Sequence, residues 1–140
     1  MEKFRVLIVD DEDDFVETMV KRLKSKGLEA EGVNRGHAAL ELLRHKEFDV
    51  CVLDVRMPGM DGIETLREMK KRDPSLEVII LTGHGSVESG IQGLQLGAYN
   101  YVMKPVPFPE LLEQIVQAYE RKVIEEERRQ HRLVHEATEL

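Results

Sequence analysis

The chain has 140 residues, of which 41% are hydrophobic and 34% are charged, a composition typical of a globular domain rather than a disordered chain. Its formal net charge of −7 disfavours contact with nucleic acid or with an anionic membrane surface, so we expect neither as a partner of these residues. The single cysteine, Cys51, excludes an intramolecular disulfide and indicates a reducing, cytoplasmic environment. No apolar run is long enough to cross a bilayer.

Short runs rich in β-branched residues alternate with amphipathic runs along residues 1–118. The expected strands are Phe4–Val9, Leu28–Val33, Phe48–Leu53, Val78–Leu81 and Tyr99–Met103. The expected helices are a first one that ends at Gly27, then Ala38–Lys46, Ile63–Lys71, Val87–Leu96, and a last one that starts near Phe108 or Pro109. We expect Asp13 or Asp14 to cap the first helix. Five strands that alternate with five helices predict an α/β fold, a doubly wound parallel sheet with helices on both faces.

The predicted helix Val87–Leu96 contains two glycines, Gly90 and Gly93. Each glycine costs about 0.8–1 kcal/mol relative to alanine in a helix interior, so we expect this helix to be the least stable one and the main moving part. The alternative is that both glycines permit close packing against a neighbouring element.

Polar side chains follow four of the five predicted strands. They are Asp10, Asp11, Asp54, Thr82 and Lys104. The carboxyl ends of parallel strands meet at one edge of the sheet, where such folds bind their ligands. Three clustered carboxylates repel one another, and a hard cation such as Mg²⁺ relieves that repulsion, while a lysine supplies a point charge for a phosphoryl oxygen. A metal, a lysine and a carboxylate nucleophile are the parts of an aspartyl-phosphate site.

Several segments match the motifs of one family in order and spacing. They are Val9-Asp10-Asp11-Glu12, Leu53-Asp54, Met57-Pro58-Gly59-Met60-Asp61-Gly62, Leu81-Thr82-Gly83 and Tyr101-Val102-Met103-Lys104-Pro105. Through them, residues 1–118 resemble the receiver domain of two-component response regulators. The stretches Leu81–Val87 and Leu96–Tyr99 look most like receivers of nitrogen-regulator-type enhancer-binding transcription activators. The resemblance implies a flavodoxin-like sheet with the strand order 2-1-3-4-5.

The resemblance also implies how the acidic residues act. Asp54 is expected to accept a phosphoryl group from a histidine kinase. Asp10 and Asp11 are expected to hold Mg²⁺ together with Asp54 and the backbone carbonyl of Arg56. The chain would then not be an enzyme acting on a separate substrate but a phosphoacceptor that catalyses its own phosphotransfer and dephosphorylation.

The remaining site residues are implied to read out the phosphoryl group. Lys104 and Thr82 are expected to contact its oxygens, and Thr82 and Tyr101 to move together as the switch. The Lys104-Pro105 peptide is expected to be cis, which places Lys104 at the site. The face formed by the fourth helix and fifth strand would then change conformation and regulate an output.

Residues 119–140 form a helical extension or a linker that exceeds what the fold needs. A heptad-like apolar stripe runs along it and is interrupted by polar residues; it consists of Val116, Tyr119, Val123, Leu133 and Ala137. This pattern is compatible with a weak coiled coil or with a solvated helix that leads to an output domain outside this chain. We expect a homodimer through the fourth helix, the fifth strand and the fifth helix.

Two other functions compete with the signalling switch. One is a Mg²⁺-dependent phosphohydrolase with an aspartyl nucleophile, but such enzymes usually carry a second acid where this chain has Arg56, and they need residues for a substrate pocket. The other is a receiver-like module that acts only through protein partners without accepting phosphate. Because 140 residues leave no room for a DNA-binding or ATPase domain, we expect either a stand-alone regulator or a fragment that ends after the receiver.

Overall fold

The computed structural model describes residues 2–56, 61–83 and 87–139, and it contains five strands and five helices in these ranges. The strands are β1 (Arg5–Val9), β2 (Glu29–Val33), β3 (Val50–Asp54), β4 (Glu77–Thr82) and β5 (Asn100–Met103). The helices are α1 (Asp13–Ser25), α2 (Gly36–Leu43), α3 (Gly62–Arg72), α4 (Val87–Gln95) and α5 (Phe108–Thr138). Strands and helices alternate along the described chain, as the sequence pattern predicts.

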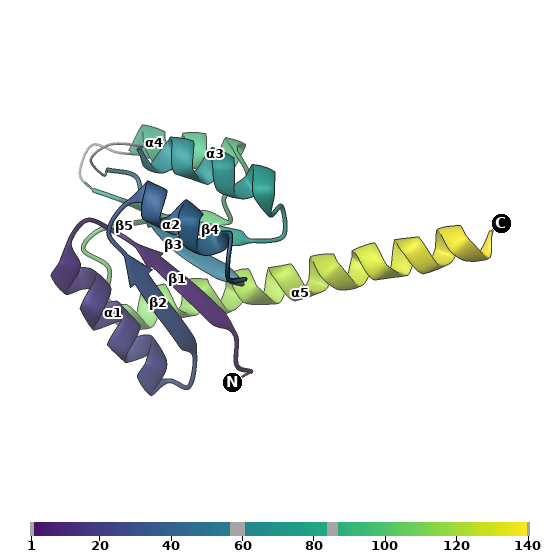
Figure 1. Ribbon diagram of the computed structural model, residues 1–140, viewed down its shortest axis with the longest axis horizontal. Helices are drawn as coiled ribbons and strands as arrows, with labels where there is room; N and C mark the ends of the chain where they lie inside the picture. The colour runs from purple at the N-terminus through teal and green to yellow at the C-terminus, as the bar shows by residue number, and fades with distance from the viewer. Residues whose placement is uncertain (1, 57–60, 84–86, 140) are drawn as a thin grey trace.

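The strands form one parallel sheet in the order β2-β1-β3-β4-β5, which confirms the predicted flavodoxin-like topology (Figure 1). Side chains alternate between the two faces of each strand, so each face has its own core. Val6 and Ile8 of β1 pack with α1 and α5, whereas Leu7 and Val9 pack on the opposite face with α2 and α3. The more polar β2 lies at one edge of the sheet, where its outer side has no strand to pair with in the described residues.

The ends of the helices differ in places from the sequence prediction. Glu12, rather than Asp13 or Asp14, is the residue that precedes the first turn of α1, and its side chain makes no capping hydrogen bond, so the predicted cap is wrong. Asp13 and Asp14 lie inside the first turn of α1, where their negative charges interact favourably with the positive end of the helix dipole and stabilise the helix. The predicted helix over residues 38–46 begins two residues earlier and ends at Leu43.

The predicted loop from Met57 to Gly62 lies only partly within the described residues. Asp61 accepts a hydrogen bond from the backbone N–H of Glu64 at 2.8 Å and thereby caps α3, and Gly62 is the first residue of that helix. The other residues of this loop, like His84, lie outside the described ranges.

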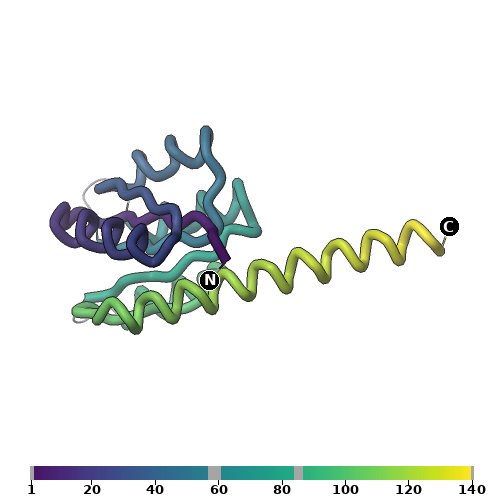
Figure 2. Tube along the Cα trace, turned by 90° about the horizontal axis from the view of Figure 1, so that it is seen from below, coloured from purple at the N-terminus to yellow at the C-terminus, as the bar shows by residue number. Residues whose placement is uncertain are grey.

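The last helix is much longer than the body of the domain requires. Figures 1 and 2 show the first half of α5 packed along the sheet and the second half projecting well beyond it. Within the described ranges, no helix is both long enough and apolar enough to cross a membrane.

Candidate phosphorylation site

The ends of four strands bring the predicted site residues to one edge of the sheet. Asp10 directly follows β1, Asp54 and Thr82 are the last residues of β3 and β4, and Lys104 directly follows β5. The ends of β4 and β5 are joined by a hydrogen bond that the Lys104 backbone N–H donates to the Thr82 carbonyl at 2.7 Å. The parallel sheet therefore assembles residues from positions 10 to 104 of the chain at one place.

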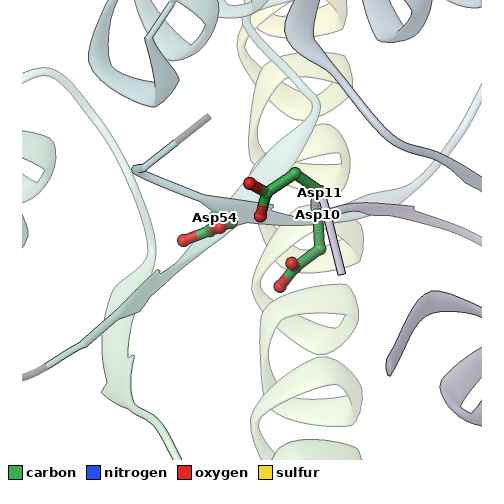
Figure 3. A group of neighbouring side chains, drawn as sticks. All are labelled: Asp10, Asp11 and Asp54. Carbon is green, nitrogen blue, oxygen red and sulfur yellow. The ribbon is translucent and has the colours of Figure 1, made fainter. Parts of the chain in front are cut away.

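Three carboxylates form the acidic part of this edge. One oxygen from each of Asp10, Asp11 and Asp54 lies within 4.8 Å of the others, and Figure 3 shows the three side chains around a common region beyond the strand ends. Asp10 and Asp54 are buried, whereas Asp11 is exposed. Carboxylate oxygens are the hard ligands that Mg²⁺ prefers, and a cation among them would offset their mutual repulsion, so the donor set fits this ion.

Burial makes two of these carboxylates harder to ionise. Burial, together with the negative charge of Asp10, raises the pKa of Asp54 from 3.8 to about 6. Burial also raises the pKa of Asp10, although its contacts with Lys104 and the backbone N–H of Glu12 act in the opposite direction. The Arg56 backbone N–H donates to Asp54 Oδ1 at 3.2 Å, which orients the carboxylate. That the Arg56 carbonyl binds metal stays a prediction.

Lys104 contacts the predicted site residue Asp10 and two residues, Glu12 and Phe15, to which the sequence analysis assigned no role at the site. Its ammonium lies 2.6 Å from Asp10 Oδ2, donates to Glu12 Oε1 at 2.9 Å, and sits 5.0 Å from the centre of the Phe15 ring. Burial alone would lower the pKa of Lys104, but the hydrogen bonds to Asp10 and Glu12 raise it overall. The position of Glu12 next to Asp10 and Asp11 in the sequence was the available signal for its role. The predicted cis peptide between Lys104 and Pro105 is confirmed.

The two predicted switch residues lie on neighbouring strands. The buried Thr82 hydroxyl donates to the backbone carbonyl of Val102 at 3.4 Å, so it is turned toward β5. Tyr101 lies in β5, pairs with Ile80 of β4, and packs its ring against Gly90 of α4, where a Cβ atom would lie 2.6 Å from the ring. The close packing that the sequence left as an alternative for Gly90 is therefore what the structure shows.

Comparison with known proteins identifies the class. Residues 6–116 match the family model of the response regulator receiver domain, and the chain belongs to that family. Receiver domains are the phosphoacceptor switch domains of two-component systems; they take phosphoryl groups from histidine kinases and bind Mg²⁺ at an acidic site. In this chain the corresponding acidic cluster consists of Asp10, Asp11 and Asp54.

Among its relatives are transcription regulators. The chain is 39% identical over 110 residues to the transcriptional regulatory protein ZraR of Klebsiella oxytoca, covering 79% of this chain and 25% of ZraR. It is 34% identical over 125 residues to the DNA-binding transcriptional regulator NtrC of Escherichia coli, covering 87% of this chain and 27% of NtrC. These matches confirm the predicted similarity to nitrogen-regulator-type receivers. The chain thus spans about a quarter of the length of these relatives.

A solved structure agrees with this assignment. The response regulator receiver domain protein from Clostridium thermocellum superposes with a TM-score of 0.82 at 32% identity, covering 86% of this chain and 98% of that one. The predicted fold is confirmed by this neighbour as well as by the strand order.

Proposed function

We propose that this chain is a phosphorylation-controlled switch that accepts a phosphoryl group from a histidine kinase onto Asp54. The observation that carries the proposal is the position of the Asp54 carboxylate at the end of the central strand β3, with oxygens of Asp10 and Asp11 within 4.8 Å. Family membership supports it, because receiver domains are phosphoacceptors in general.

The transfer follows from the chemistry of these groups. A carboxylate oxygen of Asp54 forms a bond to the phosphorus as the bond from phosphorus to the kinase histidine nitrogen breaks, and the electron pair of that bond leaves with the imidazole. Asp10, Asp11, Asp54 and the backbone carbonyl of Arg56 would hold Mg²⁺, which neutralises the charge that gathers on the phosphoryl oxygens. Since only the carboxylate is nucleophilic, the raised pKa of Asp54 disfavours the reaction below about pH 6.

Lys104 and Thr82 are the groups that would respond to the new phosphoryl group. Lys104 would exchange its contact with Glu12 for a phosphoryl oxygen, since Glu12 is largely exposed and readily rehydrated. Thr82 would turn its hydroxyl away from the Val102 carbonyl toward the phosphoryl group. That rotation removes a contact to β5, the strand that carries Tyr101. Because the Tyr101 ring packs on Gly90 of α4, a shift of β5 would be transmitted to α4.

The face that would change is also the one suited to a partner. Four large apolar side chains on α4 and at the end of β5 are 40–47% exposed: Val87, Ile91, Leu94 and Met103. We propose that a homodimer forms through α4, β5 and α5. We also propose that these residues do not themselves bind nucleic acid, because the chain carries a formal net charge of −7.

The phosphoacceptor is tested by mass spectrometry of the intact chain after incubation with acetyl phosphate and Mg²⁺. The parent chain should gain one phosphoryl group, and Asp54→Asn should gain none. Asp13→Asn, which removes an exposed acid from the first turn of α1, is the matched control and should behave as the parent does. Full phosphorylation of Asp54→Asn would refute the proposal, and continuous release of phosphate without a phosphorylated chain would instead favour the phosphohydrolase.

A further inference from the structure

The second half of α5 leaves the domain without support from it. Every residue from 124 to 139 is exposed, and Figure 2 shows this part projecting away from the sheet and the other helices. We call residues 124–138 the arm; at 1.5 Å per residue it is about 22 Å long. A helix of this length is only marginally stable in water by itself. Its direction relative to the domain therefore depends on how the preceding part of α5 is attached.

A buried carboxylate lies at the root of the arm. Glu77, the first residue of β4, has a side chain that is only 5% exposed. The Arg121 guanidinium forms a bidentate hydrogen bond with the Glu77 carboxylate: Nη2 donates to Oε1 at 2.8 Å, and Nε donates to Oε2. Lys70 of α3 adds a third charge 3.9 Å from Glu77 Oε1. A two-pronged bond of this kind fixes orientation as well as distance.

The next residue of α5 makes a second bond to a different strand. Lys122 Nζ donates to Asp49 Oδ1 at 2.6 Å, and its side chain is 13% exposed. Asp49 directly precedes β3 and is itself held by the backbone N–H of Arg5, which donates to Asp49 Oδ2 at 2.8 Å. Because successive residues of a helix point about 100° apart, bonds from Arg121 and Lys122 restrain both the rotation and the tilt of α5.

Aromatic contacts complete the attachment. The Tyr119 ring stacks on Phe4 with centroids 4.1 Å apart, and its hydroxyl donates to Glu2 at 2.8 Å. The Arg121 guanidinium also lies 4.9 Å from the centre of the Tyr99 ring. Within four residues of α5, the helix thus contacts the N-terminal segment and the amino ends of β3, β4 and β5.

We propose that Glu77, Asp49, Arg121 and Lys122 form an anchor that fixes the direction in which the arm leaves the domain. With the anchor intact, the arm is a stiff continuation of α5 and not a freely swinging linker. The anchor lies at the amino ends of β3 and β4, the two strands whose carboxyl ends carry Asp54 and Thr82. The direction of the arm is therefore set by two of the four strands that build the site.

The direction of the arm can be measured directly in the full chain, without phosphorylation. Spin labels on Thr18→Cys in α1 and Val134→Cys in the arm report one distance distribution by double electron–electron resonance; both positions are exposed, and Cys51 is fully buried and out of reach of the label. In the doubly labelled parent, we expect a single narrow distribution.

The anchor variant carries Arg121→Gln and Lys122→Gln. A pivot of about 20° at residue 124 moves residue 134 by roughly 5 Å, so we expect the distribution to shift or broaden by about that amount. The matched control carries Arg128→Gln and Arg129→Gln, which removes the same charge from the exposed part of the same helix, and it should leave the distribution unchanged. An anchor variant with the parent's distribution, or a control that broadens equally, would overturn the proposal.

Circular dichroism and a single substitution distinguish a folding defect of the anchor variant from a change in the direction of the arm. Circular dichroism establishes whether the anchor variant retains its helices, since an unfolded arm would also broaden the distribution. Should it not fold, Lys122→Gln alone keeps the hydrogen bonds from Arg121 to Glu77 and removes the contact with Asp49, together with a 3.7 Å ion pair to Glu126 within the same helix. We then expect a shift in the mean distance as α5 pivots about Arg121, and an unchanged distribution would overturn the proposal equally. None of these measurements depends on Asp54 being the phosphoacceptor.

Discussion

A single lysine side chain joins groups of different character at the carboxyl edge of the sheet. Lys104 contacts the buried Asp10, the exposed Glu12 and the face of the Phe15 ring. The Asp10 side chain is fully buried, whereas the Glu12 side chain is 67% exposed, so its ion pair with Lys104 contributes little to stability. Of the two carboxylates at Lys104, Glu12 is therefore the one that the ammonium can leave at the lower cost.

Asp54 should also leave a signature in the pH dependence of stability. Its pKa is about 6 in the folded chain and 3.8 in an ordinary environment, so between about pH 4 and pH 6 the folded chain binds more protons than the unfolded chain. The contribution of Asp54 to the free energy of unfolding is most favourable below pH 4, and this contribution is lost as the pH rises from about 4 to about 6. At neutral pH without metal, Asp54→Asn should be more stable than the parent by roughly 1–3 kcal/mol.

This prediction is checked by urea unfolding in EDTA at pH 5 and pH 7. The gain from Asp54→Asn should be larger at pH 7 than at pH 5, since the parent carboxylate is mostly protonated at the lower pH. Asp13→Asn, in an exposed helical turn, should show no such difference. Equal gains at both pH values would mean that burial does not disfavour the charge on Asp54.

At the scale of elements, the contact between α4 and β5 is closer than a side chain would permit. Gly90 is buried with its Cα toward the Tyr101 ring, and Gly93 lies against Ile80 in the same way but with more room. From sequence alone, alanine at both positions is expected to strengthen α4. The structure reverses this expectation at Gly90, because the added methyl group would collide with the ring.

We expect Gly90→Ala to lower the free energy of unfolding by roughly 1–3 kcal/mol through overpacking. Amide exchange of residues 87–95 should become faster, which mass spectrometry of peptic fragments measures. Gly93→Ala should have a smaller effect, since its Cβ would lie 3.0 Å from an Ile80 side-chain atom and 2.6 Å separates the corresponding pair at Gly90. If Gly90→Ala slows exchange instead, α4 and Tyr101 are not packed as described.

For the whole molecule, the proposed dimer predicts a concentration-dependent mass. Sedimentation equilibrium should show association that strengthens on phosphorylation. Ile91→Lys, which places a charge on the apolar face of α4, should weaken the association about tenfold, a typical cost for a central interface residue.

The arm provides the comparison for this experiment. Leu133→Lys changes an exposed apolar residue of the arm, so it should leave the association unchanged if α4, β5 and the packed part of α5 form the interface. An effect of Leu133→Lys alone would move the interface to the arm. A strictly monomeric chain in both phosphorylation states would refute the dimer.

The alternation of elements and the four strand ends could be predicted because both follow from local patterns. A run of apolar residues identifies a buried strand, and the parallel topology then places Asp10, Asp54, Thr82 and Lys104 together. The contacts made by charged helical residues were not predictable in this way. Arg121 and Glu77 lie 44 residues apart, and on a helix rich in both charges an arginine that grips a buried strand has the same local sequence as a solvated one.

The carboxylates at the amino ends of β3 and β4 have a consequence for the order of folding. During synthesis, Asp49 and Glu77 leave the ribosome 73 and 44 residues before Lys122 and Arg121 do. Until Arg121 arrives, Glu77 has only the more distant Lys70 ammonium, 3.9 Å away, and lacks both hydrogen bonds from the guanidinium, so burial of its carboxylate is unfavourable. We therefore expect docking of the last helix to complete the burial of the start of β4.

The pairing of Glu77 and Asp49 with α5 also limits how short a stable fragment of this chain can be. A fragment that ended at residue 118, where the predicted receiver ends, would keep every residue of the site but lose Arg121 and Lys122, which pair with Glu77 and Asp49 at the far edge of the sheet. The match to the family model ends at residue 116, which is also short of Arg121. The cooperative folding unit thus extends about one helical turn beyond the part of the chain that carries the chemistry.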